Sequence, residues 1–345
     1  MPSAAVGYAR RVFTLDARSL ALMRMAVALT VLVDLWVRST HLLEHYSDAG
    51  VLPRPAAFVV SGLARVSLLS LSGEPVWALT VFLAAGVLAS FVLVGFRSQL
   101  STALLWLFVL SIQHRNPLVW DHRDVLVSSA LGLGLLLRWG DAWSLDARRN
   151  GGPRAGHSRA GAGAALYVCQ IACIYGFAAL LKSGPEWRTE LSAVERAVGL
   201  QYWATALAPY LLGQPRVMMA LTAGVWWFEL LVPAMLLSPW QTARLRAVVV
   251  AGLCLMQLGF GLFLWLDTFP MISASISLGL LPASLWSRKE PIEPPLSEPR
   301  WERGLALGLL GYMLALNLLS LRRDRGDAWL RLPAEMVGLD QCWSM

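Results

Sequence analysis

Long, nearly uninterrupted hydrophobic stretches alternate with short polar segments along this chain. A helix needs about 20 apolar residues to cross the hydrocarbon core of a bilayer. The stretches are continuous rather than alternating, which disfavours a transmembrane β-barrel. The pattern therefore predicts an all-α, polytopic membrane protein with a bundle of about nine transmembrane helices. These predicted spans cover about 19–38, 75–96, 99–113, 124–140, 164–182, 216–238, 244–266, 269–286 and 303–321.

Two further apolar stretches are interrupted by charged residues or proline. They cover about 56–71, which contains Arg65, and about 190–212, which contains Glu195 and Pro209. We expect these stretches to form amphipathic or re-entrant helices at the membrane surface.

The distribution of arginine predicts the orientation, because cytoplasmic loops of membrane proteins carry an excess of Lys and Arg. With the N-terminus inside, the inner segments hold 15 such residues and the outer segments 13, of which four follow the last predicted span. The Arg- and Gly-rich loop over 141–163 is the clearest cytoplasmic segment. We therefore predict a cytoplasmic N-terminus and, with an odd number of spans, a C-terminus outside.

The composition agrees with a membrane protein and excludes an ordinary soluble domain. Hydrophobic residues make up 57% of the 345 residues and charged residues 15%, against about 45–50% and about 25% in soluble domains. The net charge of +7 comes from 27 arginines and two lysines, without any nucleic-acid-binding motif. None of the four cysteines forms a CxxC pair, which argues against thiol–disulfide chemistry. The sequence shows no internal repeat, which disfavours a transporter built from two matching halves.

Lys182 is the leading candidate for chemistry. It ends the predicted fifth span in IYGFAALLKSGPEW, directly before a helix-breaking Gly184–Pro185. Elsewhere the protein places positive charge almost entirely on arginine, and only lysine can lose its proton when it is desolvated. The alternative is a lysine whose ammonium reaches the membrane edge for solvation alone.

Polar side chains also gather at the outer ends of the predicted spans. The loop QHRNPLVWDHRD between the third and fourth spans contains His114, His122 and Asp124, and it forms either a solvated turn or a segment folded into the bundle. His41 and His45 match the H-x-x-E-H zinc pattern. Nothing in the sequence supplies the third protein ligand of a catalytic zinc, so we expect no metal site.

Charged residues also lie within the predicted spans. Asp34 and Arg38 are four residues apart and can pair on one helix face. Glu229 lies in the sixth span within WWFELLVP, where a lone carboxylate needs a partner or a proton. We expect a structural ion pair between Arg24 and Glu229.

Several segments together resemble the horizontally transferred transmembrane (HTTM) family, which includes the vitamin K-dependent γ-glutamyl carboxylases. The resemblance extends from about Arg18 to the last residue. It implies one HTTM-type helical membrane domain over 1–345, with the active site on the lumenal or outer side and without the large soluble domain of the animal carboxylase. The segments are LMRMAVALTVLVDLWVRS, YSDAGVLPR, HRNPLVWDHRDVL, SLDARR, IYGFAALLKSGPEW and DQCWSM.

The resemblance also implies a chemistry. In the carboxylases, a lysine followed five residues later by tryptophan deprotonates a hydroquinone, and Lys182 and Trp187 have that spacing. Reduced vitamin K or a menaquinone-type hydroquinone would be the cofactor, with O2 and CO2 as co-substrates and no metal. His122, or else Arg123, stands where the family has a histidine, and Gln257 replaces another histidine. Catalytic roles are thus implied for Lys182 and His122, and cofactor-binding roles for Trp187, Asp124 and Gln257.

The expected function is a carboxylase-like membrane enzyme that modifies glutamyl residues of a secreted peptide or protein. The alternative is a non-carboxylating HTTM factor for the maturation or export of secreted peptides. Both place the protein in a lipid bilayer, with the bacterial inner membrane and a site facing the periplasm or exterior as the expected location. No nucleic-acid partner is expected, and the oligomeric state stays open.

Overall fold

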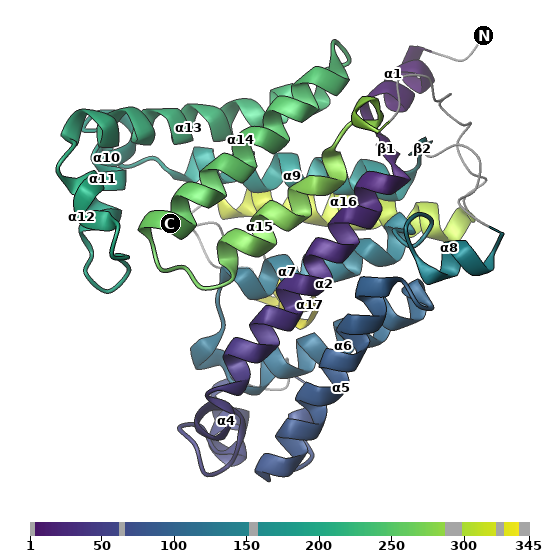
Figure 1. The fold of residues 1–345 in the computed structure, drawn as a ribbon, viewed down its shortest axis with the longest axis vertical. Coiled ribbons are helices and arrows are strands. Elements are labelled where there is room, and N and C mark those ends of the chain that lie inside the picture. Colours follow the sequence, from purple (N-terminus) through teal and green to yellow (C-terminus); the bar gives the residue numbers. More distant parts are fainter. Residues whose placement is uncertain (1–3, 62–65, 152–157, 287–298, 322–327, 338–345) are drawn as a thin grey trace. The chain divides into compact units, whose positions relative to one another are not determined.

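The structure, a computed structural model, describes residues 4–61, 66–151, 158–286, 299–321 and 328–337, and they are mostly helical (Figure 1). His157, most of the proline-rich segment 291–299 and the terminal DQCWSM lie outside the described residues. The longer helices are α1 (Ala4–Val12), α2 (Ala17–Ser39), α5 (Pro75–Val94), α6 (Ser98–Arg115), α7 (His122–Leu137), α9 (Ala162–Leu181), α13 (Pro215–Leu237), α14 (Thr242–Phe263), α15 (Phe269–Ser277), α16 (Arg300–Ser320) and α17 (Ala328–Val337). Shorter elements are β1 (Thr14–Asp16), α3 (Leu42–Tyr46), α4 (Arg54–Ser61), η2 (Leu68–Ser70), η3 (Pro117–Val119), α8 (Leu145–Arg149), β2 (Ser158–Ala160), α10 (Pro185–Arg188), α11 (Ala193–Gly199), α12 (Ala208–Leu212), η4 (Leu278–Leu280) and η5 (Ala283–Leu285).

Among the described residues, six helices are long and apolar enough to cross a membrane, namely α2, α5, α9, α13, α14 and α16. The protein is therefore a multi-pass membrane protein. The remaining three predicted spans coincide with α6, α7 and α15, which are helices but fall short of that length or hydropathy. Nine spans and the predicted orientation of the termini stay predictions.

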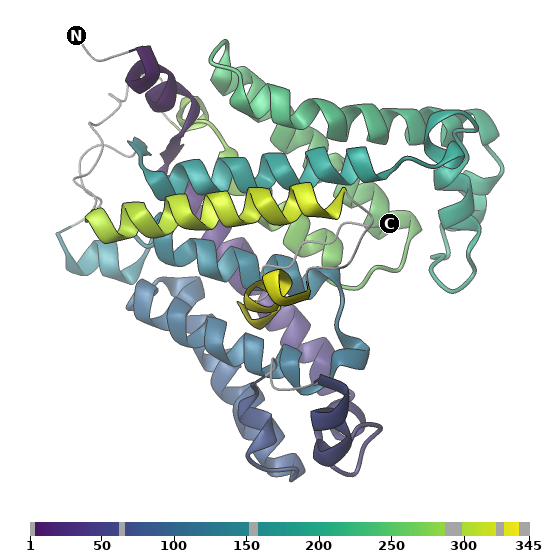
Figure 2. The same ribbon diagram turned by 180° about the vertical axis from the view of Figure 1, so that it is seen from behind.

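The chain divides into two compact units, and the first contains Met1–Asp16 and Ser158–Leu321. Within it, α13 and α16 both pack along α9, and α14 packs against α13 and α15. Figure 2 shows α16 running beside α9. The strands β1 and β2 pair antiparallel, with Thr14 opposite Ala160. Arg246 of α14 holds this segment by donating hydrogen bonds to the carbonyl oxygens of Val12 and Thr14.

The second unit contains Ala17–His157 and Arg322–Gln341. Here α2 packs against α5 and α7, and α6 packs against α5 and α7. Arg24 of α2 is completely buried. Its guanidinium donates to the carbonyl oxygens of Val92, Leu93, Trp139 and Trp143. Since the last carbonyls of a helix have no partner within the helix, Arg24 completes the end of α5.

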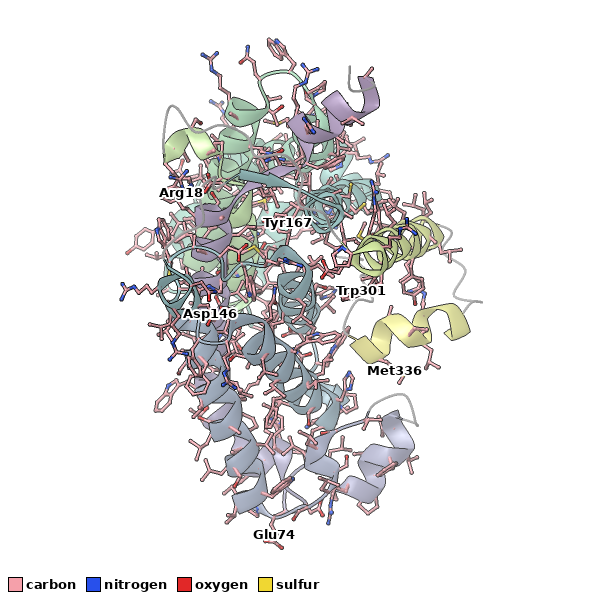
Figure 3. The ribbon with its side chains drawn as sticks, turned by 90° about the vertical axis from the view of Figure 1, so that its right-hand side faces the viewer. Arg18, Glu74, Asp146, Tyr167, Trp301 and Met336 are labelled. Atoms are coloured by element: carbon pink, nitrogen blue, oxygen red, sulfur yellow. The ribbon has the colours of Figure 1, made fainter. Side chains whose placement is uncertain are left out.

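A carboxylate caps the start of α6 in the same unit. Asp146 of α8, labelled in Figure 3, accepts hydrogen bonds from the backbone N–H groups of Arg97 (2.8 Å) and Ser98 (2.6 Å). Desolvation alone would raise the pKa of Asp146. Hydrogen bonds from Ser98 and Arg97 outweigh it and lower the pKa below its usual value. A negative charge at this position also interacts favourably with the helix dipole.

The two interrupted apolar stretches form short helices, as expected for segments that do not span. The first corresponds to α4 and η2, and the second to α11 and α12. Residues 62–65 of the first stretch lie outside the described residues.

Candidate active site

The end of α9 positions Lys182 within the first unit. The backbone N–H of Lys182 donates to the carbonyl oxygen of Ala178 at 3.2 Å, so Lys182 closes the last helical turn. Pro185 then starts the short helix α10, because proline suits a first helical position and has no N–H to donate. The Lys182 side chain is only 4% exposed. A buried ammonium is costly without a compensating partner.

Glu229 of α13 is that partner. The Lys182 ammonium donates to Glu229 Oε2, and both side chains are about equally buried. The predicted pairing of Arg24 with Glu229 is therefore wrong. Arg24 donates hydrogen bonds to backbone carbonyl oxygens, and Glu229 forms its ion pair with Lys182. Spacing along one chain cannot choose between two cations on different helices.

A close approach of α9 and α13 brings the Lys182–Glu229 pair together. A methyl group added to Gly176 of α9 would lie 2.8 Å from Pro233 Cγ of α13, so only glycine allows this separation of the helices. Pro233 has no backbone N–H, so the carbonyl oxygen of Glu229, four residues earlier, does not receive the usual helical hydrogen bond.

Trp187 is a second neighbour of the ammonium. Lys182 Nζ lies 4.7 Å from the centroid of the Trp187 ring, within the range of a cation–π interaction. Lys182 thus contacts both a carboxylate and an aromatic ring. The structure brings together these two residues, which the sequence singled out by their spacing.

Gln257 belongs to a second polar group in the same unit. Its Nε2 donates to Ser273 Oγ at 2.8 Å, and the Tyr175 hydroxyl lies 3.0 Å from the same oxygen. Gln257 Oε1 is buried and has no hydrogen-bond partner among the described residues.

Asp124 and His122 belong to the second unit. Asp124 is buried and accepts a hydrogen bond from Arg38, which also donates to Asp34 Oδ2 at 2.7 Å. The predicted Asp34–Arg38 pair is confirmed, and Asp124 extends it to two carboxylates on one guanidinium. Arg38 also donates a hydrogen bond to the hydroxyl oxygen of Tyr46 at 3.1 Å. His122 is half-buried at the start of α7.

The polar loop between α6 and α7 folds into its unit instead of forming a solvated turn. His114, Arg115 and Asn116 are all buried. Arg115 donates to the carbonyl oxygen of Leu52 at 2.9 Å, and Asn116 donates to that of His45 at 3.2 Å. These bonds replace the hydrogen bonds to water that the buried N–H groups lose on folding.

The H-x-x-E-H segment forms a solvent-exposed contact between His41 and Glu44, 2.8 Å apart. Among the described residues there is no group of three or more His, Cys, Asp or Glu side chains that could hold a metal ion.

Sequence reasoning missed Tyr175, Ser273 and Arg188 as neighbours of the candidate site. Tyr175 precedes Lys182 by seven residues, which places both on one face of a helix, so its position could have been inferred. Ser273 is one of several small polar residues in α15 and carries no local signal. Arg188 resembles many other arginines at the ends of spans.

Comparison with protein families identifies the chain. The sequence model of the HTTM domain matches residues 13–277. The chain belongs to the HTTM domain family. That match covers α2 to α15 and so includes every candidate site residue. A search of curated proteins found no match, and a search of solved structures found none either.

Proposed function

We propose that this HTTM protein is a carboxylase-like membrane enzyme in which Lys182, supported by Glu229, removes a proton from a weakly acidic ligand. The observation that carries the proposal is the buried Lys182–Glu229 pair, with the lysine ammonium 4.7 Å from the centroid of the Trp187 ring. Lysine serves as a base only when it can lose its own proton, and desolvation makes that loss easier.

Glu229 gives the lysine proton a place to go. Within their hydrogen bond, the proton can pass from the Lys182 ammonium to Glu229 Oε2, which leaves a neutral amine and a neutral carboxylic acid. Burial disfavours two separate charges, so the neutral pair is favoured relative to its population in water. The amine then takes the proton of a ligand O–H: the O–H bond breaks, an N–H bond forms, and the ligand anion faces the new ammonium.

The residues present fit a hydroquinone-type ligand. Trp187 offers an aromatic face beside the amine, and Gln257 Oε1 is a buried acceptor without a partner among the described residues. When bound, a reduced vitamin K or menaquinone-type hydroquinone would supply, with O2, the strong base needed to remove a γ-proton from a glutamyl side chain before CO2 is captured. Lys182, Trp187 and Gln257 would hold and orient that ligand. A catalytic role for His122 and a cofactor-binding role for Asp124 are proposed from the family resemblance alone.

The second candidate function is a non-carboxylating factor for the maturation or export of secreted peptides. It is favoured by the same ion pair, because Lys182 and Glu229 satisfy each other and a purely structural pair would look alike. In both cases we place the protein in the bacterial inner membrane, with Lys182 reached from the periplasmic or outer side and a secreted peptide as partner.

Replacement of Lys182 by arginine separates the two functions. The introduced guanidinium would keep the charge and the pairing with Glu229, but it cannot lose its proton at accessible pH. We expect Lys182→Arg to insert into membranes and melt as the wild type does. It should incorporate about 10²–10⁴-fold less ¹⁴CO2 into a glutamyl peptide supplied with reduced vitamin K and O2, as expected for loss of a general base.

One result would decide against Lys182 as the base, and another would decide against the enzyme. Wild-type incorporation in the Lys182→Arg variant would show that the lysine is not a base. Absence of incorporation by the wild type, together with normal peptide export by the variant, would favour the maturation factor. Membrane insertion and melting temperature are the controls for folding.

A further inference from the structure

Arg188 lies close to the Lys182–Glu229 pair, and only the Nε end of its guanidinium has a hydrogen-bond partner among the described residues. Its Nε donates to the carbonyl oxygen of Lys182 at 3.3 Å. Its guanidinium lies 5.6 Å from the centroid of the Trp226 ring. Among the described residues, these are the contacts of Arg188, and neither of its two Nη groups has a hydrogen-bond partner. The side chain is exposed.

Trp226 is itself held in place, so the support under Arg188 is rigid. The indole Nε1 of Trp226 donates to the carbonyl oxygen of Ala179 at 3.0 Å. Arg188 is therefore anchored to the last turn of α9 directly, through Lys182, and indirectly, through Trp226. A guanidinium fixed in this way loses less conformational entropy when it binds a ligand.

The acidic residues nearest in sequence leave the charge of Arg188 uncompensated. Glu229 is taken by Lys182, and Glu190 pairs with Arg196 at 2.5 Å. The carboxylate of Glu186 lies over Gly184. The Lys182–Glu229 pair carries no net charge, so Arg188 is the source of positive potential beside it.

We infer that the two Nη groups of Arg188 bind the γ-carboxylate of the glutamyl side chain that is deprotonated beside the Lys182–Glu229 pair. The planar guanidinium matches a carboxylate with two parallel hydrogen bonds. Removing a proton from a carbon next to a carboxylate concentrates negative charge there, and a fixed cation stabilises that charge. The inference rests on the proposed function and assigns Arg188 as the residue that positions the acidic substrate group.

Binding of a blocked amino acid tests this inference without requiring turnover. The full-length protein would be placed in phosphatidylcholine nanodiscs and titrated with N-acetylglutamate amide, and separately with its neutral analogue N-acetylglutamine amide, by ligand-observed NMR. We expect the wild type to prefer the glutamate compound by about tenfold or more, as for a charge-assisted bidentate contact. Arg188→Gln should abolish the preference, and Arg188→Lys should retain part of it.

Arg196→Gln is the matched control, because Arg196 is an exposed arginine of the same segment that already has a carboxylate partner. It should bind as the wild type does. Lys182→Arg should also keep the preference, so that failure of the proposed base leaves this result intact. An unchanged preference in Arg188→Gln would overturn the inference.

Phosphate of a lipid headgroup is the competing ligand for an arginine at the end of membrane-spanning helices. Adding phosphatidylglycerol to the nanodiscs, or inorganic phosphate to the buffer, distinguishes the two. If phosphate displaces the glutamate compound at a concentration below that of the glutamate compound, and if this displacement requires Arg188, the site binds a headgroup. That result would contradict the inference. Displacement only at much higher phosphate concentration supports a carboxylate site.

Discussion

Arg38 carries its charge between two carboxylates, Asp34 and Asp124, in a part of the second unit that is largely shielded from solvent. Its side chain is 5% exposed and that of Asp124 is 1% exposed. The i,i+4 spacing predicts the pair with Asp34. The bond to Asp124 joins residues 86 positions apart, and only the packing of α2 against α7 brings them together.

Removal of the Arg38 charge should leave the buried carboxylate of Asp124 without its ion-pair partner, whereas the part-buried Asp34 keeps Arg123 at 3.8 Å. We predict that Arg38→Met lowers the free energy of unfolding by about 3–5 kcal/mol, the cost of breaking a buried pair by removing one partner. Arg54→Met is the matched control, since Arg54 and Asp48 form a pair in which both side chains are about one third exposed. Exposed pairs contribute about 0–1 kcal/mol. Denaturant unfolding in detergent measures both, and equal losses would contradict the prediction.

At the scale of elements, the contact between α9 and α13 determines the geometry of the candidate active site. Lys182 follows α9, Glu229 lies in α13, and Gly176 packs on Pro233 between the two helices. The hydrophobic pattern predicts both helices with ends close to those observed. It does not predict which of their faces meet, because both helices are apolar on all sides and show little amphipathic asymmetry.

A single methyl group should disturb this contact. We predict that Gly176→Ala destabilises the protein by about 1–3 kcal/mol through overpacking, because its Cβ would lie 2.8 Å from Pro233 Cγ. Gly224→Ala in α13 meets no atom within 4 Å and should be neutral or slightly stabilising, as alanine favours helices. Thermal unfolding in one detergent compares the two variants. A loss in Gly224→Ala as large as in Gly176→Ala would show that helix packing is not the cause.

At the scale of the whole molecule, the distribution of arginine across the predicted inner and outer segments predicts the orientation. Six described helices satisfy the length and hydropathy of a span, so the protein crosses the membrane several times. Its orientation rests on the excess of positive charge in inner loops, which is a property of insertion and not of packing.

Accessibility labelling tests that orientation. We predict that a membrane-impermeant maleimide labels a cysteine at position 196 in intact cells and labels one at position 148 only after lysis. Arg196 lies in α11 and Arg148 in α8, and both side chains are exposed. The substitutions Arg196→Cys and Arg148→Cys would be made in a variant lacking the four native cysteines. Labelling of both positions from outside would refute the orientation.

Local hydrophobicity by itself determined the helical membrane class, the positions of the six long helices and the short helices between them. Insertion of an apolar segment depends on the residues of that segment alone, so these features can be read from one stretch at a time. Three further features could also be read from single segments. They are the position of Lys182 at the end of an apolar stretch, its spacing to Trp187 and the Asp34–Arg38 pair.

Tertiary structure decided which partner each buried polar group has. Glu229 pairs with Lys182 rather than Arg24, Asp124 joins Arg38, and the loop between α6 and α7 is buried. A buried charge or donor takes whichever partner helix packing brings within about 3 Å. That choice depends on contacts between segments far apart in the chain, which no pattern within a single segment contains.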